Sequence, residues 1–191
     1  MACALCESNK KRGGYINANA QTFPPYKTTD INVYENGLVR RMDESDWNPS
    51  RHKLLLFYPE TNTPVCASEM GAVNNWIDKF DELDCDVYSI TTDPIGMVKQ
   101  WYEENEDLKD PKYKALSSFM LTSRMGLLYN ERAKRASVFI TKEGDVVTQE
   151  HFLKVGRSLS ELHRMMFAYT TGSYCAEGWH DPSDGFLSDN N

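Results

Sequence analysis

The sequence lacks long apolar runs and an excess of positive charge, and both absences exclude classes of protein. No apolar segment approaches the ~20 residues that a membrane-spanning helix needs, so we predict no transmembrane helix. Acidic residues outnumber basic ones by 28 to 21, and the net charge of −7 argues against a general binder of nucleic acids or anionic membranes. We therefore expect neither a nucleic-acid partner nor a membrane partner.

Glycine, proline and cysteine are also few, and the cysteine count bears on the cellular compartment. With 11 glycines and 8 prolines among 191 residues, the chain is not low-complexity or disordered as a whole. The N-terminus becomes polar and basic at residues 10–12, without the apolar stretch of a signal peptide. Five cysteines are an odd number for a fully paired secreted framework, so we expect a reducing compartment, the cytoplasm.

The chain length indicates one folded domain with a tail at either end. We expect residues 1–22 to form a flexible lead, residues 23–170 the domain, and residues 171–191 an irregular C-terminal tail that carries Cys175. Strand patterns alternate with helix patterns along the domain, which is typical of a compact α/β fold with a central mixed sheet flanked by helices.

The predicted strands lie at 53–58 and 86–91, with hairpins at 31–40 and 136–152. One helical face spans residues 68–83, and a second helix spans 95–104. Residues 105–134 are polar and stay unassigned. A capping box at 158–161 opens the last helix. The residues expected on its buried face are Leu159, Leu162, Met165, Met166 and Tyr169.

Cys66 is the most informative residue, because it stands where a buried strand gives way to a helix. The strand at 53–58 ends at Pro59, a short loop leads to Cys66, and a helical pattern follows. A thiol in this position meets free backbone N–H groups and the positive end of the helix dipole, which both favour the reactive thiolate. An inert buried cysteine is the competing interpretation.

Several side chains are candidates to act on Cys66. Thr63, three residues earlier, can direct its hydroxyl to the sulfur or to a substrate oxygen. Glu69, about one turn later, can orient a basic side chain. That cation is expected from Arg135, just before the strand at 136, or from Arg157, just before the last helix. Each arginine taken singly also fits a solvated surface position.

The other cysteines and histidines give weaker signals. A protease-like pair of Cys66 and His151 is compatible with the spacing, but no local signature supports it. Cys3 and Cys6 form a CxxC without two further ligands at suitable spacing, so we favour an incidental pair over a zinc site. Cys85 fits core packing. The chain has no glycine-rich phosphate loop and no nicotinamide or flavin fingerprint.

Four segments, taken in order, match motifs of one known family. PETNTPVC at residues 59–66, preceded by FY, resembles an active-site signature of the form PxxxTxxC. RASVF at 135–139 resembles the segment with the active-site arginine, and VGRS at 155–158 the stretch before the last core helix. YCAEGW at 174–179 resembles a resolving-cysteine segment. Together they resemble the peroxiredoxins, in particular the typical two-cysteine subgroup with the alkyl hydroperoxide reductases and thiol-specific antioxidant proteins.

The resemblance implies a thioredoxin-like fold and a thiol-dependent peroxidase acting on hydrogen peroxide and organic hydroperoxides. Cys66 would be the nucleophile that becomes a sulfenic acid, and Cys175 would resolve it to a disulfide across a dimer interface. Thr63 and Arg135 would hold the peroxide. A thioredoxin-like protein or another dithiol would reduce the disulfide. The implied assembly is a homodimer that can form a decamer, and no metal or organic cofactor is implied.

The family resemblance also assigns supporting residues. Pro59 would shield the pocket, Glu69 and Arg157 would position Arg135, and Tyr58 belongs to the same active-site motif. The chain departs from the family where Ala67 and Ala176 replace the prolines usual after the two cysteines, which puts the rigidity of both loops in doubt. Two alternatives stay open: a redox-controlled chaperone or peroxide sensor on the same fold, and a one-cysteine peroxidase in which Cys175 is idle.

Overall fold

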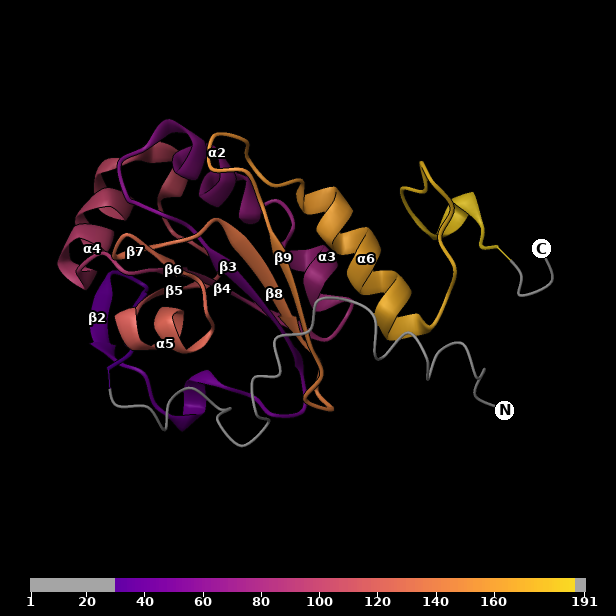
Figure 1. Cartoon of the computed structure of the whole chain (residues 1–191), viewed down its shortest axis with the longest axis horizontal. Coiled ribbons are helices and arrows are strands. Elements are labelled where there is room, and N and C mark those ends of the chain that lie inside the picture. Colours follow the sequence, from indigo (N-terminus) through magenta and orange to yellow (C-terminus); the bar gives the residue numbers. More distant parts are fainter. Residues whose placement is uncertain (1–29, 188–191) are drawn as a thin grey trace.

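The computed structural model describes residues 30–187, which form a seven-stranded mixed sheet with helices on both faces (Figure 1). The strand order is β2-β1-β5-β4-β3-β8-β9. β4 pairs in parallel with β3 and β5, and the other neighbours are antiparallel. The strands of this sheet are β1 Asn32–Glu35, β2 Leu38–Arg41, β3 His52–Phe57, β4 Cys85–Thr91, β5 Lys114–Ser117, β8 Ala136–Ile140 and β9 Val146–Glu150. The predicted α/β class with a mixed sheet is confirmed.

The helices form two layers around this sheet. Side chains of α2, α3, α4 and α6 join Leu54 and Leu56 in one core, while α5 joins Leu55 and Phe57 in a second core on the other face. β3 is buried along its whole length, as expected for a strand covered on both faces. The helices are α2 Pro64–Val73, α3 Ile77–Asp81, α4 Ile95–Glu104, α5 Phe119–Arg124 and α6 Leu159–Thr171, with short 3-10 turns η3 Glu44–Asp46, η4 Glu106–Leu108 and η5 Pro182–Asp184.

The β1–β2 hairpin follows from its turn residues. Asn36 and Gly37 both have positive φ, at 51° and 78°, which is the conformation that an Asn-Gly pair adopts in a tight hairpin turn. Residues 105–134, which carried no clear pattern, contain η4, β5, α5 and a small pair of strands, β6 Leu128–Tyr129 and β7 Arg132–Ala133. All of these elements have six residues or fewer, so their periodicity is too short to stand out.

Two predictions about the helices are wrong in detail. The single helical face at 68–83 is two helices, because residues 74–76 leave the helical path and the Asn74 side chain accepts a hydrogen bond from Lys112 N (2.9 Å). On α6 the buried stripe is Leu159, Leu162, His163 and Met166, and the predicted Met165 and Tyr169 are exposed. His163 takes their place because its ring packs against Phe80 on α3 and against Trp76 in the turn before α3.

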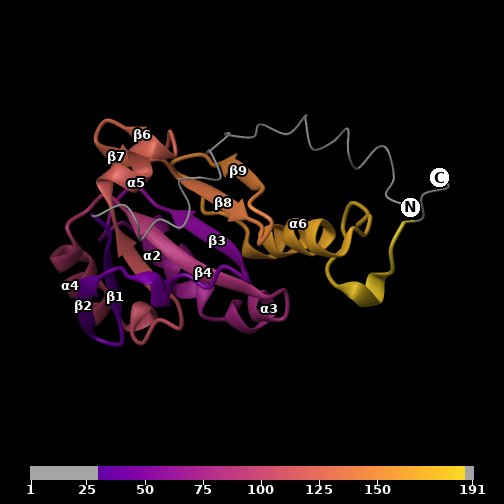
Figure 2. The same cartoon turned by 90° about the horizontal axis from the view of Figure 1, so that it is seen from below.

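The tail beyond α6 extends away from the sheet and from α2 in both views (Figures 1 and 2). Gly172, with φ of 69°, ends α6 in the left-handed conformation that favours glycine. The tail contains little regular structure, as expected, yet it folds around the buried Trp179. The predicted lead at 1–22, with Cys3 and Cys6, lies outside the described residues. Within residues 30–187, no helix has both the length and the apolar character to cross a bilayer.

Gly71 allows close packing between α2 and η4, and this generates a stability prediction. A Cβ atom at position 71 would lie 3.0 Å from the carbonyl oxygen of Asp107, so Gly71→Ala should lower the free energy of unfolding by about 1–3 kcal/mol. Gly96→Ala on α4 is the control, because no atom lies within 4 Å of its added Cβ. Urea denaturation should show it unchanged or stabilised by up to about 1 kcal/mol. Equal effects of both substitutions would contradict the argument.

Candidate active site

Cys66 lies in the first turn of α2, the helix that follows the central strand β3 after a short loop. Thr63 is the N-cap with extended backbone (φ −111°, ψ 142°), and the helix begins at Pro64. The helix therefore starts two residues before Cys66 and not after it, because proline fits the first helical position well. The Cys66 side chain is buried, with 1% of its surface exposed. Its sulfur thus combines burial with the unpaired N–H groups and positive dipole of a helix start.

Arg135 places a positive charge at this sulfur. Its Nη2 lies 3.4 Å from Cys66 Sγ in hydrogen-bond geometry. The sheet register explains the proximity, because β8 runs antiparallel to β3 and pairs Ala136 with Phe57, at the end from which the chain leads to α2. Arg135 is itself buried, and its Nε and Nη2 also donate to the carbonyl oxygen of Leu153 at 3.2 and 3.1 Å. A guanidinium in this position stabilises a sulfur anion relative to a neutral thiol.

Glu69 connects two buried arginines beneath the sulfur. Its Oε2 accepts from Arg135 Nη1, and its Oε1 accepts from Arg157 Nε at 3.0 Å and from Arg157 N at 2.6 Å. Arg157 also donates to the carbonyl oxygens of Ala136 (2.9 Å) and Phe57 (2.5 Å), so it ties the end of β3 to the start of β8. Burial, and then the charge of Arg135, lower the pKa of Arg157. The Glu69 carboxylate offsets the repulsion between the two guanidiniums.

A cavity of about 930 Å³ opens in front of Cys66. Pro59 and Thr63 line it together with Cys66, Arg135 and Leu153. The Thr63 hydroxyl donates to the carbonyl oxygen of Glu60 (3.2 Å), so it does not direct its proton to the sulfur, which was one of its two expected roles. A role towards a substrate oxygen remains a prediction.

Tyr58 lies behind the site rather than in its cavity. Its ring is fully buried and packs against Trp101, with 5.6 Å between ring centroids. Burial raises the pKa of its hydroxyl well above the ordinary value, and the hydroxyl has no hydrogen-bond partner among the described residues. Tyr58 therefore remains neutral and supports the loop between β3 and α2 by packing.

His151 also lines the cavity, but the geometry does not pair it with Cys66. Its Nε2 lies 2.9 Å from the hydroxyl of Ser137. Burial and the charges of Arg157 and Arg135 lower its pKa to about 4, so it is uncharged at neutral pH. The cation at the sulfur is Arg135, and the protease-like pair is not assembled. The Leu153 carbonyl, which anchors Arg135, was not predicted because a backbone acceptor leaves no signal in the sequence.

The remaining described cysteines lie elsewhere. Cys175 is half-buried on the tail that extends away from α2, so Cys66 and Cys175 are not brought together within this chain (Figures 1 and 2). Cys85 begins β4 and pairs with His52 at the opposite end of the parallel strands. It packs in the core, and burial raises its pKa, as expected for a structural cysteine.

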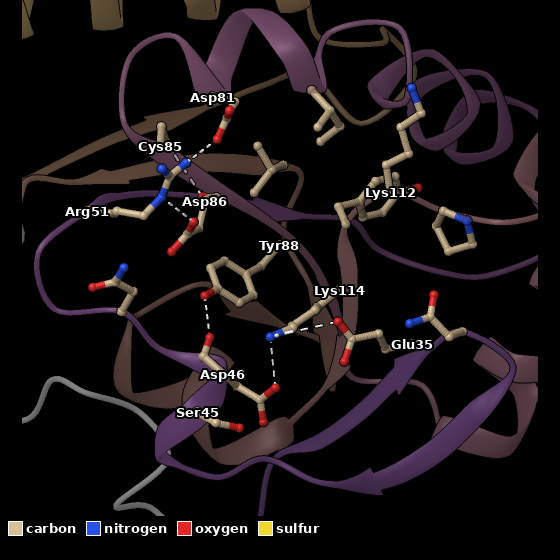
Figure 3. A pocket seen from close by; sticks show the side chains of 16 residues that line it. Glu35, Ser45, Asp46, Arg51, Asp81, Cys85, Asp86, Tyr88, Lys112 and Lys114 are labelled. Carbon is tan, nitrogen blue, oxygen red and sulfur yellow. Dashed lines mark hydrogen bonds and ion pairs between the residues drawn. The ribbon is translucent and has the colours of Figure 1, made fainter.

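A second cavity, of about 490 Å³, lies near Cys85 (Figure 3). Apart from Lys112, its charged groups are already paired with each other. Asp46, which is buried, binds Lys114 at 2.9 Å, and Arg51 binds Asp81 and Asp86 at 2.6 and 2.7 Å. No three His, Cys, Asp or Glu side chains between residues 30 and 187 lie close enough to hold a metal ion. The cavity in front of Cys66 is therefore the better candidate for chemistry.

A buried cysteine in the first turn of a helix, with a guanidinium at its sulfur, is an arrangement that favours thiolate chemistry, as in thiol-based oxidoreductases. Comparison with known proteins agrees. The AhpC/TSA family matches residues 21–149. A putative peroxiredoxin, YkuU of Bacillus subtilis, is 30% identical over 146 residues, covering 71% of this chain and 80% of that protein. Alkyl hydroperoxide reductase C of Mycobacterium tuberculosis is 26% identical over 175 residues, covering 84% and 90%.

Solved structures show the same relationship. Enterococcus faecalis AhpC superposes with a TM-score of 0.69 at 26% identity, over 77% of this chain and 93% of that one. A reduced two-cysteine peroxiredoxin of Plasmodium vivax gives a TM-score of 0.72 over 83% and 87%, and at 23% identity this likeness concerns the fold. The chain belongs to the AhpC/TSA family and has its thioredoxin-like fold. It is a thiol-dependent peroxidase of the peroxiredoxin class.

The shared carboxylate of Glu69 generates a first prediction for the site. Glu69→Gln would leave Arg135 and Arg157 buried without a counterion, so the free energy of unfolding should fall by about 3–5 kcal/mol in urea denaturation. Glu103→Gln is the matched control, because Glu103 forms an exposed pair with Lys99 at 3.5 Å and should cost no more than about 1 kcal/mol. A loss at Glu69 no larger than the control would be incompatible with this role.

His151 generates a prediction about pH. Its pKa is about 4 in the folded protein against 6.5 ordinarily, so the unfolded state binds more protons between these values. Stability should therefore fall as the pH drops from 6.5 towards 4, and His151→Gln should make this decline shallower in pH-dependent thermal unfolding. His52 and His163, whose pKa values burial also lowers, account for a residual slope. An unchanged slope in the variant would refute the assignment.

Proposed function

We propose that Cys66 is the peroxidatic nucleophile and that Cys175 resolves its oxidised form. One observation carries the proposal: Arg135 Nη2 lies 3.4 Å from a buried sulfur in the first turn of α2. The Cys66 thiolate attacks one peroxide oxygen, and the S–O bond forms as the O–O bond breaks. The other oxygen takes a proton and leaves as water or an alcohol, and Cys66 becomes a sulfenic acid.

The neighbouring residues have separate roles in this step. Arg135 and the free N–H groups of the first turn stabilise negative charge as it moves from sulfur to the leaving oxygen. Thr63 and Pro59 line the cavity, where they orient the peroxide and limit access of water. Glu69 and Arg157 hold Arg135 in place. Tyr58 packs behind the loop.

The second step requires another chain. The Cys175 thiolate attacks the sulfenic sulfur, the S–S bond forms, and the oxygen leaves as water. Because the described part of the tail, residues 172–187, points away from α2, we infer that Cys175 of one chain meets Cys66 of another in a homodimer (Figure 1). A thioredoxin-like dithiol then reduces the disulfide by exchange. Hydrogen peroxide and small organic hydroperoxides are the proposed substrates.

Cysteine substitutions test both steps. Cys66→Ser should abolish peroxide consumption with a dithiol donor, and peroxide should convert the unaltered protein to a disulfide-linked dimer on non-reducing gels. Cys175→Ser should remove that dimer, whereas Cys85→Ala, a buried control at the end of the parallel strands opposite the site, should retain it. A dimer that persists without Cys175 would disprove its role. Negligible turnover by the unaltered protein, with disulfide formation retained, would favour the sensor alternative.

A further inference from the structure

The tail holds Cys175 in a fixed relation to α6. Phe167 of α6 packs against Trp179 and Phe186, with ring centroids at 5.1 and 5.7 Å. Trp179 Nε1 donates to the carbonyl oxygen of Gly185 (2.8 Å), and its backbone N–H donates to that of Ala176 (3.2 Å). The segment around Cys175 is therefore folded on itself and anchored to the helix. A charged side chain on the adjoining face of α6 is therefore held at a fixed distance from Cys175.

Arg164 supplies such a charge. Its Nε and Nη2 donate to the two oxygens of Glu161, one turn earlier on α6, at 2.7 and 2.6 Å. This leaves Nη1 to donate to the carbonyl oxygen of Ala176, next to Cys175, at 3.3 Å. Arg164 and Cys175 line the same groove between α6 and the tail. Glu161 thus fixes the plane of the guanidinium while partly neutralising its charge.

Other charged groups also face this groove and contribute to the electrostatic environment of Cys175. His52 comes from β3, Lys142, Glu143 and Asp145 come from the β8–β9 turn, and Glu177 lies on the tail near Arg164. Partial burial raises the pKa of Cys175, and Arg164 is the charged group that lowers it. Tyr169 further engages Asp145 through its hydroxyl at 3.0 Å. Arg164 is therefore the group whose removal should change the charge state of this thiol.

We propose that Arg164 is a positioning residue for the resolving step, holding the segment of Cys175 and stabilising its thiolate for attack on the Cys66 sulfenic acid. This role rests on the proposed function. The attack forms the S–S bond and breaks the S–O bond, and the departing hydroxide takes a proton to become water. The rate depends on the fraction of Cys175 that is thiolate, which the guanidinium increases.

The test separates the two steps by rapid mixing with hydrogen peroxide, acid quench and mass spectrometry of the sulfenic acid and the disulfide. Arg164→Gln should leave sulfenic acid formation at Cys66 unchanged. It should slow disulfide formation about three- to tenfold at pH 7 and move the pH profile of that step upward, because thiolate fraction changes tenfold per unit of pKa. Glu161→Gln keeps the guanidinium and removes its neutralising partner, so it should move the profile downward. Arg164→Lys should recover part of the rate.

The outcomes distinguish this role from simpler ones. A purely structural contribution would slow the step by the same factor at every pH, and Glu161→Gln would then act in the same direction as Arg164→Gln; either result would overturn the proposal. If Arg164→Gln does not fold, the shift in Glu161→Gln decides the matter. Failure of the unaltered protein to form a sulfenic acid would reject the proposed function instead, since no resolving step would exist.

Discussion

The carboxylate of Glu69, buried between the guanidiniums of Arg135 and Arg157, is the interaction on which the arrangement around Cys66 depends. Among residues 30–187, neither arginine forms an ion pair with another acidic side chain, and each is almost fully buried. A buried charge without a counterion is costly, so each of these three side chains can be buried only when the other two are in place. Because Glu69 lies on the same helix as Cys66, the set fixes the sulfur and its cation to one another.

The sheet register makes this set possible. β3 ends at Phe57, directly opposite Ala136 at the start of β8. Arg157 donates hydrogen bonds to the carbonyl oxygens of both residues, and Arg135 directly precedes Ala136 in the chain. A slip of one residue would turn Arg135 to the other face of the sheet. Strand pairing thus brings Arg135 close to Cys66, and hydrogen bonds fix its final orientation.

The sequence allowed site residues to be predicted where a reactive or charged side chain stands at the end of a predicted strand or helix. Cys66, Glu69, Arg135 and Arg157 were candidates from local patterns and from the family motifs, and the structure brings them together. The fold class followed from alternating patterns, whereas β5 and α5 are too short to show a period. The Leu153 carbonyl and the packing of His163 depend on tertiary contacts that no local window contains. Trp179 was visible within a motif, but its role in folding the tail was not.

The two cysteines of the proposed cycle have different environments, and the difference suits the order of the two steps. Cys66 lies against a buried network of charged side chains, where the local dielectric is low and salt screens little. Cys175 is half-buried beside Arg164, whose partner Glu161 is also half-buried, and it lies on a tail joined to α6 by a few contacts. A nucleophile that must select a peroxide benefits from rigidity, while the resolving thiol keeps its guanidinium partner only as long as the tail stays on α6. The aromatic cluster that holds the tail there is small and lies outside both main cores.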